Sequence, residues 1–159
     1  MNYTFVRDIL PILRWSEAQA LRRAGTWTDR DLVGFARDGD LDDPLVLALA
    51  ACEASDREIT ELVERLAMRD TDGEPAHVSL VVDVALALTR DVSSALSEIE
   101  ALYASLEYPE CLRPFVRYEQ VEEAVPATVE EAERRLVVEA ARFVNEEAAR
   151  LGARDRRSR

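Results

Sequence analysis

The chain has 159 residues, the usual size of one domain, and 48% of them are hydrophobic. An excess of acidic residues gives a formal net charge of -12, which argues against binding of nucleic acid or of an anionic membrane surface by the folded part and favours a basic partner. Five glycines and six prolines are few for a protein with many tight turns, so helices are favoured over a sandwich or barrel.

We predict an all-α fold with about seven or eight helices, arranged as a single-domain bundle or as stacked helix hairpins. The domain is expected to cover residues 1–152, with a disordered arginine-rich tail at 153–159. The start lacks a long apolar segment behind a basic one, and no apolar run reaches the ~20 residues of a membrane-spanning helix. These features predict a cytoplasmic protein in which Cys52 and Cys111 are buried or incidental thiols.

Helical spacing of apolar residues predicts five helices in the first half of the chain. The segment 44–54 is apolar on nearly all sides, which places it in the middle of a bundle. Two Ser-x-x-Gln/Glu capping boxes are predicted, at Ser16 and at Ser55. The five segments are 3–13 with Pro11 kinking or ending it, 16 to about 24, one around 32–36 after a cap at Thr28 or Asp29, 44–54, and one after the Ser55 cap with an apolar stripe over 59–67.

The second half is also predicted to be helical. Residues 78–88 contain β-branched residues that suggest a strand, but their length, their alanines and Pro75 favour a buried helix. A further helix follows a cap at Asp91 or Ser93, and 119–126 is expected to be an irregular acidic connection. Thr128 begins the longest helix, which runs to about 151 and is predicted to bury Val129, Ala132, Leu136, Ala140 and Phe143.

No catalytic, metal or cofactor site is predicted. The single histidine, His77, lacks partners at metal-ligand spacing and is read as structural or surface-exposed. The acidic loop containing Asp38, Asp40, Asp42 and Asp43 does not fit the EF-hand pattern, because Asp43 replaces the turn glycine and Leu49 the bidentate glutamate. That loop is either a solvated turn or a partner-binding edge. With thirty-two acids in the chain, an enzyme using paired carboxylates stays a less favoured alternative.

One stretch, 101–120, contains three of the four tyrosines. The sequences EIEALY at 98–103, LEYPE at 106–110 and FVRY at 115–118 resemble a bacterial family of uncharacterised proteins, domain of unknown function 2247. Members are small cytoplasmic proteins, some encoded near polymorphic toxins, so the resemblance implies an immunity role.

Aromatic residues among acids are typical of a binding hot spot. The partner-binding residues predicted here are Tyr103, Glu107, Tyr108, Glu110, Arg117 and Tyr118. The alternative is that these tyrosines cap the core. The leading hypothesis is a non-enzymatic protein that neutralises a cognate basic toxin domain through its acidic surface. A helical scaffold or adaptor with another partner is the alternative.

Overall fold

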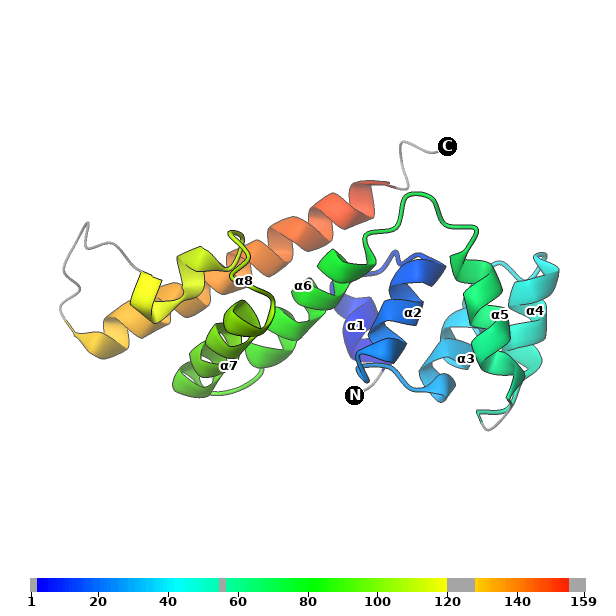
Figure 1. Ribbon diagram of the computed structural model, residues 1–159, viewed down its shortest axis with the longest axis horizontal. Helices are drawn as coiled ribbons and strands as arrows, with labels where there is room; N and C mark the ends of the chain where they lie inside the picture. The colour runs from blue at the N-terminus through cyan, green and yellow to red at the C-terminus, as the bar shows by residue number, and fades with distance from the viewer. Residues whose placement is uncertain (1–2, 55–56, 120–127, 155–159) are drawn as a thin grey trace. The chain divides into compact units, whose positions relative to one another are not determined.

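The computed structural model describes residues 3–54, 57–119 and 128–154. Regular structure within these residues is helical throughout, which confirms the predicted all-α fold (Figure 1). Residues 78–88, whose β-branched residues suggested a strand, fall almost entirely in helix α6, as predicted. The helices are α1 (Tyr3–Ile9), α2 (Trp15–Arg23), α3 (Asp29–Arg37), α4 (Pro44–Ala51), α5 (Glu58–Ala67), α6 (Pro75–Ala87), α7 (Val92–Ser105) and α8 (Val129–Ala153), with 3-10 turns η1 (Arg113–Phe115) and η2 (Arg117–Glu119).

Contacts within the chain divide it into two compact units. That residues 1–152 form a single domain stays a prediction. Unit 1 comprises Met1–Leu80 and Leu151–Arg159, and unit 2 comprises Val81–Arg150. The chain passes between the units inside α6 and again inside α8. Of the predicted tail, Ala153 closes α8 and Arg154 forms an ion pair, while 155–159 lie outside the described residues.

Unit 1 is built from α1 to α5, with α3 packed on α4, α2 on α5, and α4 on α5. Its helix starts follow standard capping chemistry. The Thr28 hydroxyl accepts a hydrogen bond from the Asp31 N–H, while the Asp43 carboxylate accepts one from the Leu45 N–H ahead of α4. Pro44 occupies the first position of α4, where its missing N–H costs nothing.

Four aromatic rings pack together in unit 1. The Phe35 ring centroid lies 4.6 Å from that of Trp15 and 5.5 Å from that of Trp27, and the Tyr3 centroid lies 5.4 Å from that of Trp27. The edge-on and tilted arrangements suit the quadrupoles of the rings. The cluster joins α1, the start of α2 and α3: Trp15 is the first residue of α2, and Trp27 immediately precedes the Thr28 cap of α3.

Two sequence predictions in unit 1 are wrong. The capping box of α2 uses Arg14 as N-cap and the carboxylate of Glu17, which accepts the Arg14 N–H at 2.9 Å, and not Ser16 with Gln19. Helix α4 is not central: it buries Val46 and Leu49, while Leu47 is 53% exposed. The α2 prediction failed because the helix begins at Trp15, which places Ser16 inside its first turn, where the Ser16 N–H donates to the Asp70 carboxylate at 2.6 Å. The cap predicted at Ser55 lies outside the described residues.

The Glu17 carboxylate is fully buried and connects distant segments of unit 1. Besides capping α2, it accepts the Glu74 N–H at 2.9 Å and the Arg154 guanidinium at 2.7 Å. Charge-assisted hydrogen bonds of this kind compensate for burying a charge. Glu17 therefore ties the start of α2 to the start of α6 and to the residue that follows α8.

Unit 2 contains the remainder of α6, α7, η1, η2 and most of α8. The Asp91 carboxylate caps α7 by accepting the Ser94 N–H at 3.1 Å, as predicted. Helix α8 buries Leu136, Ala140 and Val144, but Val129 is 73% exposed, so its predicted burial is wrong. Val129 is the first residue of α8. The connection predicted at 119–126 falls almost entirely outside the described residues.

Within the described ranges, no helix combines the length and apolar composition required to cross a membrane.

Candidate functional site

Helix α7 ends in a Schellman motif that turns the chain back over its own last turn. The Tyr108 N–H donates to the Tyr103 carbonyl at 2.8 Å, and the Glu107 N–H donates to the Ala104 carbonyl at 3.4 Å. The Tyr108 ring then packs edge-on against the Tyr103 ring, with centroids 5.2 Å apart. This is the apolar contact that usually accompanies the motif, so the end of α7 places one tyrosine directly against another.

The backbone at this turn is strained. Glu107 has φ 57° and Tyr108 has φ 65°, in the left-handed region that glycine prefers. Side chains with a Cβ cost about 1–2 kcal/mol per residue in this conformation. A turn that needs a left-handed residue would be more stable with glycine, so strain of this kind is a reason to ask what Glu107 and Tyr108 do.

The 3-10 turns bring a third tyrosine to the same place. Phe115 in η1 is buried and its ring lies 5.5 Å from that of Phe143 in α8. This anchor positions η2, in which the Tyr118 ring lies 6.3 Å from that of Tyr103. Tyr103 is only 4% exposed, whereas Tyr108 and Tyr118 are 61% and 62% exposed. We call the exposed side chains around Tyr103 the tyrosine surface; they are those of Leu106, Glu107, Tyr108, Glu110 and Tyr118.

Arg117 fixes η2 against both neighbouring helices of unit 2. Its guanidinium donates to the two carboxylate oxygens of Glu100 in α7, each at 2.8 Å, and to Glu133 in α8 at 2.9 Å. Glu100 also accepts the Arg117 N–H at 3.1 Å. The hydrogen bond from Arg117 lowers the pKa of Glu100 despite partial burial. Tyr103 and Arg117, which the sequence suggested as partner contacts, are thus placed in the support of the tyrosine surface.

The tyrosine surface lies in a negatively charged environment. Burial and then the Glu119 carboxylate raise the pKa of Tyr103, while burial followed by Glu100 and the Tyr108 phenol raises that of Tyr118. Arg113 pairs with Glu119 at 3.3 Å and with Glu110 at 3.6 Å. Across this end of unit 2, five glutamates face two arginines, a local charge of -3; the residues are Glu100, Glu107, Glu110, Glu119, Glu133, Arg113 and Arg117.

The acidic loop of unit 1 has a different character, because its carboxylates serve the fold. Asp38 accepts the Tyr3 hydroxyl at 2.9 Å and pairs with Arg7, and Asp43 caps α4 and pairs with Arg69 at 2.7 Å. The Asp40 carboxylate accepts the Asp42 N–H at 3.1 Å. Among the described residues, no three His, Cys, Asp or Glu side chains are placed to hold a metal ion.

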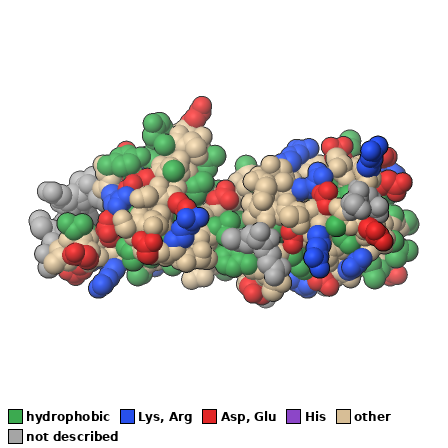
Figure 2. Space-filling model, turned by 90° about the horizontal axis from the view of Figure 1, so that it is seen from below, with side chains coloured by type: hydrophobic (Ala, Val, Ile, Leu, Met, Phe, Trp, Pro, Cys, Tyr) green, Lys and Arg blue, Asp and Glu red, His purple; other side chains and the backbone are tan. Residues whose placement is uncertain are grey.

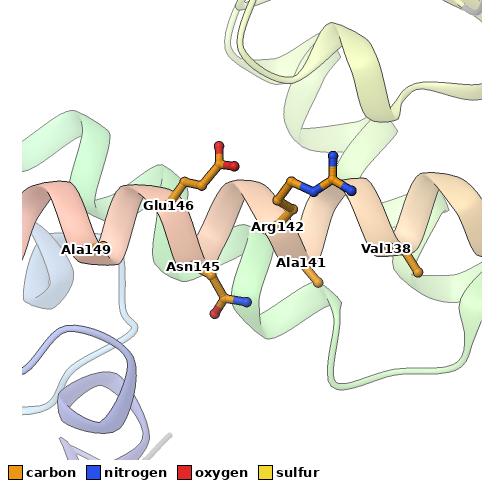
Figure 3. Close-up of a pocket in the computed structure, with 6 residues that line it drawn as sticks. All are labelled: Val138, Ala141, Arg142, Asn145, Glu146 and Ala149. Carbon is orange, nitrogen blue, oxygen red and sulfur yellow. The ribbon is translucent and has the colours of Figure 1, made fainter.

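A shallow, largely open groove lies on the surface of α8, and its described lining residues all belong to this helix. Its volume is about 510 Å³, and its lining is mainly apolar; the residues are Val138, Ala141, Arg142, Asn145, Glu146 and Ala149 (Figure 3). In Figure 3, Arg142 and Glu146 project from one edge of the helix and Asn145 from the other, so the polar groups diverge. The groove therefore lacks the convergent groups expected of a ligand site.

Neither cysteine forms a disulfide, and burial raises the pKa of the Cys111 thiol, which disfavours the thiolate needed for nucleophilic attack. Burial also raises the pKa of the Asp83 carboxyl in α6.

The face shown in Figure 2 has arginine and carboxylate side chains interspersed, so much of the acidic charge there stands beside compensating arginines. The Glu107 carboxylate differs: within the described part of the chain it forms no ion pair. The acid-tyrosine composition of this stretch was readable from the sequence. The ion pairs of Arg117 with Glu100 and Glu133 were not predicted from the sequence. Their one signal there is an arginine between two amphipathic helices that carry glutamates.

By fold and surface, the chain is an all-α protein with an exposed patch of tyrosines and glutamates. Its sequence matches the family model DUF2247, described as an uncharacterized protein conserved in bacteria, over residues 13–148, and the chain belongs to this family. The match includes the whole tyrosine surface, and it confirms the resemblance found in residues 98–118. No curated protein and no solved structure matches the sequence significantly.

Proposed function

We propose that the protein is a non-enzymatic binding protein whose partner docks on the tyrosine surface, and that it acts in the cytoplasm. The observation that carries this proposal is the strained turn at Glu107 and Tyr108, which holds a 61% exposed tyrosine against a buried one. Rigid tyrosines supported by a packed base are the side chains that dominate protein interfaces. Backbone strain that is already present in the unbound protein is consistent with preorganisation for a partner.

The kind of partner follows from charge and from the family resemblance. A net charge of -12 attracts a basic protein and speeds its association, and this attraction weakens as salt screens the charges. The family resemblance suggests toxin association for some members, so the specific proposal is an immunity protein that blocks a cognate basic toxin domain. An acidic surface that covers a cationic active site would neutralise such a toxin without chemistry.

A growth assay tests this proposal. A toxin-like gene next to the gene for this protein, expressed alone in a bacterial host, should arrest growth, and co-expression of this protein should restore it. The variant carrying Tyr108→Ala and Tyr118→Ala should lose the rescue, while Val138→Ala, at a similarly exposed residue of α8, should keep it. If the product of the neighbouring gene binds this protein one-to-one but does not arrest growth, the scaffold alternative replaces the immunity role. Rescue that survives the double substitution would refute docking on the tyrosine surface.

A further inference from the structure

We propose that the tyrosine surface recognises an arginine side chain of the partner, which stacks on the exposed rings of Tyr108 and Tyr118 and pairs with the Glu107 carboxylate. This inference rests on the proposed function and specifies the chemical group that the surface binds. It is drawn from three features of the described residues: open aromatic faces, an unpaired carboxylate beside them, and a filled arrangement of the same kind elsewhere in the chain.

The filled arrangement lies in unit 1. The Arg7 guanidinium lies 5.7 Å from the centroid of the Tyr3 ring, donates to the Tyr3 hydroxyl at 3.1 Å and pairs with Asp38. A planar guanidinium can meet both groups because its face stacks on a ring while its N–H groups reach a carboxylate in the plane. Arg7 stands four residues after Tyr3 on α1, so here the helix places the arginine beside the tyrosine, and Asp38 supplies the carboxylate.

The tyrosine surface offers the same groups, and the arginine at its edge, Arg113, pairs with Glu110 and Glu119 and not with Glu107. Tyr108 and Tyr118 flank the buried Tyr103, and both present most of their surface to solvent. Glu107 immediately precedes Tyr108 in the strained turn, and its exposed carboxylate forms no ion pair within the described residues.

The surroundings favour a cation over a neutral or anionic group. The local charge of -3 persists after Arg113 and Arg117 are counted, and both arginines are already engaged with glutamates. An incoming arginine would reduce the repulsion among these carboxylates, whereas a partner carboxylate would add to it. Stacking adds a contribution that depends on the rings and not only on charge, so it separates this site from the acidic surface in general.

The test uses the full chain and two short peptides that differ in one group. The first is acetyl-Gly-Arg-Gly-Arg-Gly-amide, and the second replaces each arginine by citrulline, a neutral urea of nearly the same shape. Binding is followed by the NMR shifts of residues 105–119 and of the tyrosine rings. A variant ending at Arg154 repeats the titration so that the chain's own terminal arginines do not compete.

The arginine peptide is expected to shift the Glu107, Tyr108 and Tyr118 signals, and the citrulline peptide is not. Tyr108→Ala and Glu107→Gln should each weaken arginine binding roughly 2- to 5-fold, while Glu146→Gln on α8, which removes an equal charge, should leave it unchanged. Equal shifts from both peptides, or shifts spread evenly over acidic residues, would overturn the inference. If the partner protein still loses binding in the Tyr108→Ala and Tyr118→Ala variant while the peptides behave alike, the docking surface stands and the arginine assignment fails.

Discussion

Replacing Glu107 by glycine should stabilise the protein, because it removes strain from the turn after α7. A residue with a Cβ in the left-handed region costs about 1–2 kcal/mol. Glycine loses more backbone entropy on folding, which offsets roughly 0.5–1 kcal/mol of that gain. The net expectation is an increase of about 0.5–1 kcal/mol in the free energy of unfolding, measured by urea denaturation monitored at the tyrosines.

Two control variants separate backbone strain from charge and from general effects of glycine. Glu107→Gln removes the carboxylate but retains the strain, so its stability should stay close to that of the native chain. Ala104→Gly, placed in the exposed last turns of α7, should destabilise by about 0.5–1 kcal/mol because φ is helical there. If Glu107→Gly is no more stable than Glu107→Gln, the positive φ at this position carries no strain and the argument for a preorganised turn fails.

Three further predictions concern the supporting interactions. Arg117→Leu should lower the free energy of unfolding by about 1–2 kcal/mol in urea, since it leaves the Glu100 and Glu133 carboxylates unpaired; an effect no larger than that of Arg135→Leu, at an exposed pair, would contradict the stabilising role of the Arg117 ion pairs. Glu17→Gln should cost about 2 kcal/mol in the same assay, because the fully buried carboxylate serves three donors; a near-neutral change would contradict its connecting role. Burial, followed by the hydrogen bond to Asp38, raises the pKa of Tyr3 from 10.0 to about 12, so its contribution to stability is full below pH 10.0 and is lost as pH rises through about 12. Spectrophotometric titration should therefore show a highest tyrosine step that Tyr3→Phe removes.

Periodicity and capping predicted most helices because these signals are local. Helices α3, α6, α7 and α8 begin near the residues whose side chains or proline rings favour a helix start. The cap of α2 was missed because Glu17 is shared with Glu74 and Arg154, which are distant in sequence. No local pattern indicates that a glutamate will be buried by residues more than fifty positions away.

The exposure of α4 shows a second limit of sequence reasoning. An apolar helix was placed in the middle of a bundle, but its outer face carries small residues and Leu47, which a surface tolerates. Similarly, composition located the tyrosine-rich stretch but could not tell which of its tyrosines are buried and which are exposed. Tyr103 is buried by helical position, whereas the left-handed turn after α7 exposes Tyr108. That turn depends on backbone conformation that a Leu-Glu-Tyr-Pro sequence does not signal, since glycine is absent from it.

The most direct test of the account is the affinity of the isolated partner for the native chain and for the variant with Tyr108→Ala and Tyr118→Ala, measured by calorimetry at low and high salt. We predict that the double substitution weakens binding by about 30-fold or more, the effect of losing a hot spot of about 2 kcal/mol, and that salt weakens binding of the native chain. The variant must retain the native unfolding transition. An affinity unchanged by the double substitution would contradict docking on the tyrosine surface.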